Sequence, residues 1–311
     1  MHHGSGCGLK AFRRFIYCPE RAAFSGGMGI MLLDQLTIIG VGLIGGSVGL
    51  AAKTHGIARK IVGVGRDERS LARAQSVGAI DSFTTSLDEG VSAADLVVVC
   101  TPVDRVAQDV ISVALASPPK AVITDAGSTK GNIVRELAGK MPVGRAMFVG
   151  SHPLAGSEKK GSSNSRGDLF ESRLVIVTPT SDTDMEAAAL VELFWQQLGA
   201  RVIRMDPFDH DEALAVTSHL PHAAAAGLAG VTPVGLLSLT AGGFRDCTRV
   251  ASGDPQLWAA IFEANRDAVL TATDKFLDRM TDFRRTLAAG DVANLTKWLA
   301  EAKQVRDALG S

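Results

Sequence analysis

Short apolar runs alternate with helical segments along the first two thirds of the chain. Most of these runs are continuously apolar, which is expected of strands buried on both faces of a sheet. They lie at residues 36–39, 60–64, 95–100, 121–124, 147–149 and 174–177, and a last short run lies at 201–204. A helical pattern at 182–199 precedes that last run. Because the runs alternate with helices, the sequence predicts an α/β fold with a parallel sheet covered by helices.

Beyond residue 209 the pattern changes, since no further β-rich run follows. Segments 211–228, 256–280 and 291–309 have the spacing of helices. We therefore predict an α/β domain over residues 34–206 and an all-helical domain over residues 207–311. The helical domain is expected to form the far wall of an active-site cleft and the interface of a homodimer.

Residues 1–33 precede the first predicted domain and differ from the rest of the chain. They contain Glu20 and no continuous apolar segment, so neither an organellar transit peptide nor a secretory signal fits. Met28 and Met31 lie just ahead of the first strand. We interpret the segment as a disordered extension or an overextended translation start, in preference to a targeting segment.

Composition narrows the class of protein. The chain has 311 residues, of which 46% are hydrophobic, enough for two folded domains. Its formal net charge of -1 gives no nucleic-acid footprint, so a small molecule is the expected partner. The four cysteines show neither metal-ligand spacing nor a disulfide framework, so we expect a cytoplasmic protein without a metal. The apolar stretch 223–243 contains Pro233 and many small residues, which predicts packed helices rather than a membrane span.

A glycine motif follows the first predicted strand and opens a helix. In this context the first glycine allows a tight turn, the second lets the backbone approach a pyrophosphate, and the third lets helix and strand pack closely. The unpaired amides of the helix N-terminus then face the phosphates. We therefore predict a Rossmann-like domain that binds a nicotinamide cofactor. The expected contacts are Gly40, Gly42, Leu43, Ile44 and Gly45 at the phosphates, and Thr101 and Pro102 beside the nicotinamide.

The end of the second predicted strand bears on the choice between NAD and NADP. NAD enzymes place an acid there to bind the ribose hydroxyls, but this chain has Gly65 followed by Arg66. A guanidinium pairs well with a 2′-phosphate, which favours NADP. Two alternatives stay open at this point. Asp67 could substitute for the missing acid, or Arg66 could stack on the adenine of NAD.

Three polar segments lie at strand ends and helix starts, where an α/β sheet presents its chemistry. They span residues 125–130, 150–158 and 218–222. A single histidine in a loop is more often structural than catalytic, and a Gly-Ser turn is often a simple helix cap. The joint occurrence of the three segments favours a catalytic site.

With these segments the sequence resembles the prephenate and arogenate dehydrogenase family, which makes the tyrosine precursor by oxidative decarboxylation. The resemblance runs from Leu36 to the end of the chain. It rests on the glycine motif, the turn with Ser128, the loop that begins at His152, the segment 218–222, and residues 243–258 with Arg249 and Trp258. The family has a Rossmann-like domain followed by a helical dimerisation domain, in agreement with the division predicted above.

The resemblance implies roles for two residues at the reacting carbon. His152 is implied to accept the hydrogen bond and the developing proton of the ring hydroxyl, as a hydride leaves that carbon for the nicotinamide. A neutral imidazole suits this task at physiological pH. Ser128 is implied to orient His152 and the nicotinamide.

Prephenate carries two carboxylates, so its site needs cations or strong donors. Arg249 is the predicted anchor, because a guanidinium matches a carboxylate bidentately. His219 and His222 lie three positions apart on one face of a predicted helix and are expected to assist, unless they support helix packing instead. The resemblance also implies a supporting or gating role for Glu158 and a pocket wall at Trp258. Prephenate is preferred over arogenate, which has an amino group in place of the side-chain keto group.

Two other interpretations predict different residues. The β-hydroxyacid dehydrogenases also have a Rossmann domain followed by helices, but they use a lysine where this chain has His219 and His222. A non-catalytic NADP-binding sensor dimer would keep the glycines without needing His152, Ser128 and Arg249 together. Both are less favoured than a prephenate or arogenate dehydrogenase.

Overall fold

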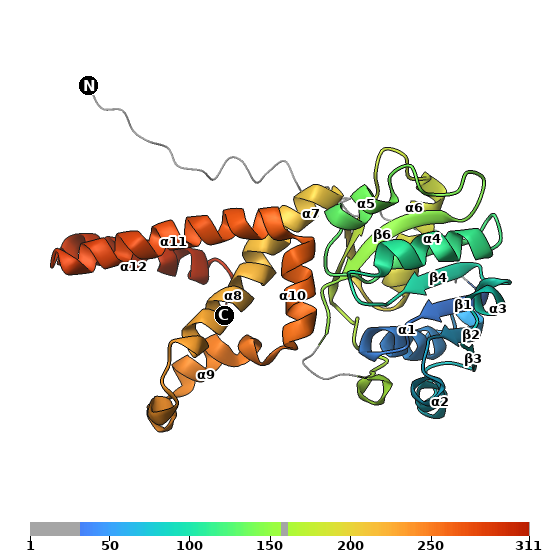
Figure 1. Ribbon diagram of the computed structural model, residues 1–311, viewed down its shortest axis with the longest axis horizontal. Helices are drawn as coiled ribbons and strands as arrows, with labels where there is room; N and C mark the ends of the chain where they lie inside the picture. The colour runs from blue at the N-terminus through green and yellow to red at the C-terminus, as the bar shows by residue number, and fades with distance from the viewer. Residues whose placement is uncertain (1–31, 157–160, 311) are drawn as a thin grey trace.

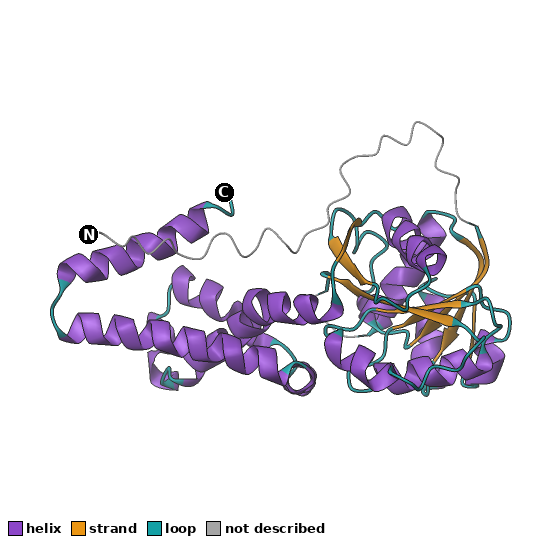
Figure 2. Ribbon diagram, turned by 90° about the horizontal axis from the view of Figure 1, so that it is seen from above, coloured by secondary structure: helices purple, strands orange, loops and turns teal. Residues whose placement is uncertain are grey.

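Figure 1 shows the computed structural model, which describes residues 32–156 and 161–310. One body holds a sheet with helices around it, and an elongated second body holds helices (Figure 2). The last strand of the first body, β8, ends at Arg204, and the first helix of the second, α7, begins at Pro207. The predicted N-terminal extension lies outside the described residues except at its end, where strand β1 begins at Leu33.

In the described residues the sheet has eight strands, in the order β3-β2-β1-β4-β5-β6-β7-β8. Their bounds are β1 Leu33–Ile39, β2 Ala58–Val64, β3 Ser82–Thr84, β4 Leu96–Val99, β5 Val122–Asp125, β6 Met147–Pro153, β7 Leu174–Thr178 and β8 Arg201–Arg204. Neighbouring strands are parallel except β6 and β7, which are antiparallel. The connection between those two has only the short 3-10 segment η2 Ser162–Asn164 in its described part, whereas parallel crossovers usually carry a helix. The pattern did not predict β3, because three residues are too few to show a period.

Helices cover both faces of the sheet. Ile38 and Ile39 are neighbours in β1 but pack into two separate apolar clusters, because successive side chains of a strand point to opposite faces. One cluster includes Val48 and Trp195, and the other includes Val110. The helices of this body are α1 Leu43–Thr54, α2 Glu68–Ser76, α3 Leu87–Val91, α4 Val106–Ala116, α5 Gly131–Leu137 and α6 Met185–Gln197.

The strand order reverses at β1, which lies between β2 and β4. Such a reversal opens a crevice at the carboxyl ends of parallel strands, where dinucleotides bind. The amide of Cys100 donates to the carbonyl of Ile39 at 2.7 Å, and the amide of Gly40 donates to the carbonyl of Val64 at 2.8 Å. These bonds place the glycine turn after β1 beside the ends of both neighbouring strands.

The second body is helical throughout its described residues, as predicted. Its elements are α7 Pro207–Leu214, the π-helical segment η3 Ala215–His219, α8 Leu220–Gly230, η4 Val234–Leu239, α9 Gly242–Thr248, η5 Arg249–Ser252, α10 Pro255–Ala264, α11 Arg266–Ala288 and α12 Val292–Asp307. The helix predicted over 211–228 is interrupted by η3, since Pro221 has no amide hydrogen and regular pairing cannot pass through it. The helix predicted over 256–280 is divided at Asn265 into α10 and α11.

The apolar stretch 223–243 is divided between α8, η4 and the start of α9. In the part of the chain that the structure describes, no helix combines the length and the apolar character needed to span a membrane. Location in the cytoplasm stays a prediction.

Candidate active site

The turn after β1 has the geometry that a pyrophosphate needs. Gly40 has a φ of 86°, and a side chain at Gly45 would come within 2.4 Å of the carbonyl oxygen of Gly40. A side chain at Gly42 would meet no atom within 4 Å, so this glycine faces open space. Helix α1 starts with Leu43 and Ile44 and has neither a capping side chain nor an acid in its first turn. Its first amides are thus available to an anionic group.

The loop after β4 borders the same crevice. A side chain at Gly40 would contact the carbonyl of Cys100 and the methyl group of Thr101. Oγ1 of Thr101 is buried and has no hydrogen-bond partner among the described residues. Because a buried hydroxyl without a partner is costly, this atom fits a contact with a bound cofactor. Pro102 follows as an exposed residue.

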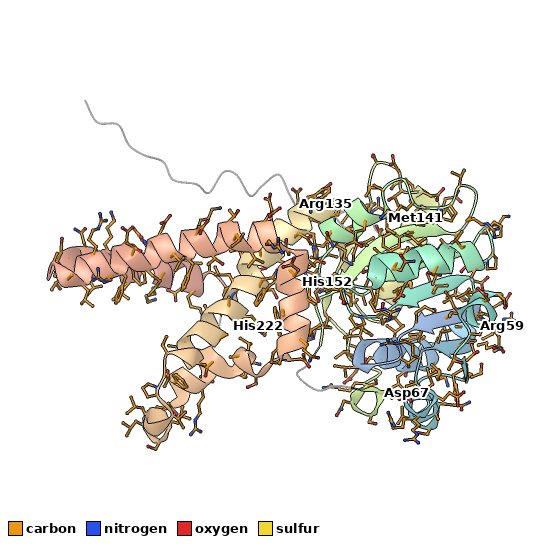
Figure 3. All side chains as sticks on the ribbon, in the orientation of Figure 1. Arg59, Asp67, Arg135, Met141, His152 and His222 are labelled. Atoms are coloured by element: carbon orange, nitrogen blue, oxygen red, sulfur yellow. The ribbon has the colours of Figure 1, made fainter. Side chains whose placement is uncertain are left out.

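In sheets of this kind the ribose of a dinucleotide binds beyond the second strand, which here is followed by Gly65, Arg66 and Asp67. Arg66 is exposed there. Asp67 lies just before helix α2 (Figure 3). Its carboxylate caps this helix by accepting from the amides of Arg69 at 3.3 Å and Ser70 at 3.2 Å. A hydrogen bond from the Ser70 hydroxyl is the main cause that lowers the pKa of Asp67. Engagement of Asp67 in the cap weakens the alternative that it replaces the missing ribose-binding acid.

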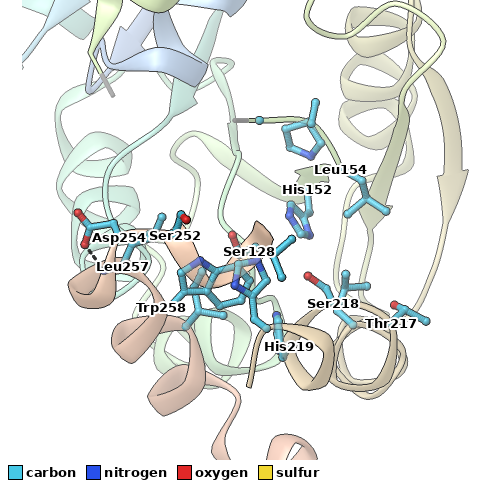
Figure 4. A pocket seen from close by; sticks show the side chains of 18 of the residues that line it. Ser128, His152, Leu154, Thr217, Ser218, His219, Ser252, Asp254, Leu257 and Trp258 are labelled. Carbon is cyan, nitrogen blue, oxygen red and sulfur yellow. Dashed lines mark hydrogen bonds between the residues drawn. The ribbon is translucent and has the colours of Figure 1, made fainter. Parts of the chain in front are cut away.

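A pocket of about 930 Å³ lies between the two bodies (Figure 4). Its walls come from the turn after β5 and from β6 on one side, and from η3, α8, η5 and α10 on the other. Six residues that the sequence singled out line it: Ser128, His152, His219, His222, Arg249 and Trp258. Glu158 lies outside the described residues. The fold thus brings together segments that are far apart in the sequence.

His152 lines this pocket from strand β6, next to Pro153, and its side chain is almost fully buried. Its Nδ1 lies 2.9 Å from Nε2 of His210, and Nδ1 of His210 lies 2.8 Å from Oδ1 of Asp211. The three residues form a chain of hydrogen bonds from helix α7 to the pocket. Nε2 of His152 is the ring nitrogen that remains for a ligand.

Asp211 joins the two bodies. Its carboxylate accepts from the backbone amides of Lys130 and Gly131, both at 2.8 Å. Its carbonyl accepts from Nδ2 of Asn265 at 2.8 Å, and the same amide nitrogen lies 3.1 Å from Nδ1 of His219. One residue of α7 therefore connects the start of α5, the end of α10 and a second histidine of the pocket.

A buried ion pair holds the turn that carries Ser128. The ammonium of Lys130 pairs with the carboxylate of Asp125 at the end of β5, and both side chains are almost fully buried. Asp125 also accepts from the amides of Gly127 at 2.9 Å and Ser151 at 3.0 Å. The turn is thereby tied to β6 beside His152.

The surroundings keep the pocket histidines neutral. Burial is the main cause that lowers the pKa of His152 well below its usual value, and His210, Lys130 and His219 add to the effect. Burial also lowers the pKa of His210, and it lowers that of His219 to about 4. Since a neutral imidazole keeps one lone pair, His152 can accept a proton at neutral pH.

The wall formed by the helical body combines aromatic rings with a cation. The rings of His222 and Trp258 stack with centroids 3.3 Å apart. Burial, and after it the charge of Arg249, lowers the pKa of His222. Arg249 stands exposed at the start of η5 and lines the pocket. This wall therefore offers a guanidinium and two rings to a ligand.

Comparison with known proteins places the chain in a family. A model described as prephenate dehydrogenase, nucleotide-binding domain, matches residues 48–204, and one described as prephenate dehydrogenase, dimerization domain, matches residues 206–301. The chain belongs to the prephenate dehydrogenase family. It is therefore an NAD(P)-dependent oxidoreductase, and the predicted fold class is confirmed.

Individual relatives of the prephenate dehydrogenase family cover most of the chain. The prephenate dehydrogenase of Bacillus subtilis is 34% identical over 284 residues, which make up 89% of this chain and 76% of that protein. The cyclohexadienyl dehydrogenase of Zymomonas mobilis is 34% identical over 289 residues, 89% of this chain and 97% of that protein. The crystal structure of prephenate dehydrogenase from Aquifex aeolicus with hydroxyphenyl propionate and NAD+ has a TM-score of 0.81 and 33% identity, covering 89% of this chain and 98% of that one.

Three residues beside the pocket were not predicted from the sequence. They are His210, Asp211 and Asn265. His210 and Asp211 are adjacent in the sequence at the start of the helical domain, and this pairing was the one feature that could have indicated them. Asn265 gave none, because its contacts depend on the packing of α7, η3 and α10. In the described ranges no cluster of His, Cys, Asp and Glu could hold a metal ion.

Proposed function

We propose that this chain oxidises prephenate with loss of carbon dioxide, forming 4-hydroxyphenylpyruvate and using NADP. The observation that carries the proposal is the pocket in which a neutral imidazole, His152, and a cation, Arg249, lie in one cavity. When bound, the nicotinamide cofactor supplies the hydride acceptor. A steady-state assay of cofactor reduction with prephenate tests the proposal.

The crevice at the switch point of the sheet fits the dinucleotide. The uncapped start of α1 and the open space at Gly42 suit a pyrophosphate, which Gly40, Leu43, Ile44 and Gly45 would hold through their turn and backbone. The hydroxyl of Thr101 would gain a partner from the bound cofactor, with Pro102 beside it. These are the contacts that we propose for the cofactor.

His152 acts at the carbon that bears the ring hydroxyl. Its Nε2 accepts a hydrogen bond from that hydroxyl, whose proton becomes more acidic as the C–H bond breaks and its electron pair leaves as hydride. The bond between the ring and its carboxylate breaks next, its electron pair completes the aromatic ring, and carbon dioxide leaves. His152 takes the hydroxyl proton as the hydride leaves and returns it to the phenol oxygen of the product when the bond to the carboxylate breaks. Ser128, held by the turn that Asp125 ties to β6, orients His152.

The helical wall binds the carboxylates of the substrate. Arg249 is the proposed anchor, because a guanidinium forms paired, charge-assisted hydrogen bonds with a carboxylate. His219 and His222 supply neutral donors beside it, and the ring of Trp258 forms the wall against which His222 stacks. We also propose a supporting role for Glu158 at the pocket.

We propose prephenate in preference to arogenate from the described part of the pocket lining. Among the described lining residues, Asp254 is the one carboxylate. It caps α10 by accepting from the amides of Gln256 at 2.8 Å and Leu257 at 2.9 Å. The ammonium of arogenate needs a carboxylate partner, whereas the keto oxygen of prephenate needs only a donor.

Replacing Arg249 by glutamine is expected to lower kcat/KM for prephenate roughly 10- to 100-fold, mainly through KM. A hydrogen bond to a charged group contributes about 1.5–3 kcal/mol, and glutamine retains no charge. Initial-rate kinetics at saturating cofactor measure the effect. Arg285→Gln is the matched control, because Arg285 is exposed on α11 and pairs with Asp282. An unchanged KM in Arg249→Gln would remove Arg249 from the substrate site.

The choice of NADP is proposed from Arg66 and Gly65. Arg66 is exposed at the ribose end, and Asp67 is engaged in the cap of α2. A cation without a competing ribose-binding acid favours a 2′-phosphate.

Replacing Arg66 by alanine is therefore expected to raise KM for NADP about tenfold and to leave KM for NAD within about twofold. The loss corresponds to one partly solvated charge-assisted hydrogen bond of about 1.4 kcal/mol. The control is Arg59→Ala at the other end of β2 (Figure 3). Arg59 pairs there with Asp34. Equal changes for both cofactors would show that Arg66 does not select NADP.

We infer that the chain forms a homodimer through its helical body. Large apolar side chains of α11 and α12 are more than half exposed in the single chain: Leu270, Leu277, Leu287, Leu299 and Val305. Exposed apolar surface of this kind marks an interaction site. The match to a dimerization domain supports the same partner, a second copy of the chain.

A further inference from the structure

The carboxylate of Asp211 is the acceptor in each of its hydrogen bonds. Backbone amides only donate, so the contacts of Lys130 and Gly131, both at 2.8 Å, make both carboxylate oxygens acceptors. A carboxylate has no proton to donate. The bond of 2.8 Å between Oδ1 and His210 is therefore donated by Nδ1 of His210.

This direction determines where the proton of His152 lies. A neutral imidazole carries one N–H, so His210 with its proton on Nδ1 accepts through Nε2. The proton between Nε2 of His210 and Nδ1 of His152, 2.9 Å apart, then belongs to His152. His152 consequently has its lone pair on Nε2, the nitrogen that remains for a ligand.

The backbone carbonyl of Asp211 acts through Asn265 and places the proton of His219 on the other ring nitrogen, Nε2. A carbonyl only accepts, so the contact at 2.8 Å identifies the Asn265 atom as the amide nitrogen, which carries two protons. Its other proton is donated to Nδ1 of His219 at 3.1 Å. His219 therefore carries its own proton on Nε2.

We propose that Asp211 is a positioning residue that sets both proton positions, so that His152 accepts from the substrate and His219 donates to it. The carboxylate acts through His210, and the carbonyl acts through Asn265. The inference rests on the proposed function for its consequence in catalysis. The proton positions themselves can be tested without any substrate.

The assignment requires neutral rings, and the surrounding charges favour them. Lys130 and Asp125 face the site from the sheet side as a buried pair, and His210 and Asp211 face it from α7. Lys130, His210 and His219 all disfavour a charge on His152, and burial does so most. Each of these rings therefore carries a single proton at neutral pH.

Opposite proton positions on His152 and His219 match two different oxygens of the substrate. The acceptor at His152 takes the hydrogen bond of the ring hydroxyl, whose acidity rises as the hydride leaves. The donor at His219 binds an oxygen of the substrate on the side of Arg249, since both residues line the same pocket. Two donors would leave the proton of the ring hydroxyl without an acceptor, and two acceptors would leave the other substrate oxygen without the donor of His219.

Nitrogen NMR of the 15N-histidine-labelled protein without substrate tests the inference directly. His152 should be protonated on Nδ1 and His219 on Nε2, with each signal assigned by its loss in His152→Asn or His219→Asn. A wild-type protein with the proton of His152 on Nε2, or with the proton of His219 on Nδ1, would overturn the proposal.

Asp211→Ala gives the second test. His152 should then show a mixture of the two proton positions, and kcat should fall on the order of 100-fold, the lower limit of a general-base contribution. KM for NADP should stay within about twofold. The matched control is Asp206→Ala on the same helix, where Asp206 caps α7 through the amide of Phe208 at 2.8 Å. A loss of kcat with the wild-type proton position retained would assign Asp211 a merely structural role and overturn the proposal.

Failure of this inference is distinguishable from failure of the proposed function. If the NMR result holds but prephenate is not oxidised, the proposed function fails and the proton positions stand. If prephenate is oxidised but His152 carries its proton on Nε2, the role of Asp211 fails alone. Should Asp211→Ala not fold, the wild-type NMR measurement still decides the matter.

Discussion

Replacing His152 by asparagine is expected to lower kcat for prephenate oxidation on the order of 10²- to 10⁴-fold, the range attributed to a general base. Asparagine retains a polar side chain on β6 but cannot accept a proton at neutral pH. KM for NADP should change little, because the glycine turn and the start of α1 are separate from β6. Initial rates of cofactor reduction at saturating substrate measure the effect.

The pH profile of the wild-type protein provides a check on the same residue. The pKa of His152 is lowered by burial first, so the neutral base persists below the usual value of 6.5 and is lost only as the pH falls through the lowered pKa. The acidic limb of kcat should thus lie below pH 6.5. His55→Asn is the control, because His55 is exposed at the end of α1. Near wild-type kcat in His152→Asn would remove His152 from the reaction.

Replacing Lys130 by methionine is expected to lower the free energy of unfolding by about 3–5 kcal/mol, the cost of breaking a buried ion pair by removing one partner. The side chain of Lys130 is 1% exposed and that of its partner Asp125 is 0% exposed. Asp125 would keep its bonds from Gly127 and Ser151 but would lose the compensating charge. Denaturant unfolding of wild type and variant measures the difference.

Two further variants test whether the loss of stability comes from leaving a buried charge without its partner. Lys303→Met breaks an exposed pair with Asp307 on α12 and should cost about 0.5 kcal/mol or less. The double variant Lys130→Met with Asp125→Asn should recover part of the stability, because no uncompensated charge is left buried. A cost below about 1 kcal/mol for Lys130→Met alone would show that the pair does not hold the turn.

The sequence predicted the architecture well, because strands buried on both faces leave long apolar runs. Every predicted run became a strand of the sheet, and the glycine turn lies at the reversal of strand order. The antiparallel direction of β7 could not be predicted, because an apolar run has no direction. The break at η3 was accessible in principle from Pro221, whose missing amide excludes regular helical pairing.

The candidate site was predicted in part. His152, Ser128 and Arg249 were found through motifs, and the pocket brings them together. The connection from Asp211 through His210 to His152 was not found, because it depends on α7 packing against β6 and α5 across the two bodies. Hydrogen-bond direction, which distinguishes His152 from His219, is a property of three-dimensional contacts and leaves no periodic pattern in a sequence.

A steady-state comparison of prephenate and arogenate, each with NADP and with NAD, tests the proposed activity of the purified chain most directly. Reduced cofactor and released carbon dioxide are measured together. The highest kcat/KM is expected for prephenate with NADP, with one carbon dioxide released for each cofactor reduced. A higher kcat/KM for arogenate, or cofactor reduction without carbon dioxide release, would contradict this expectation.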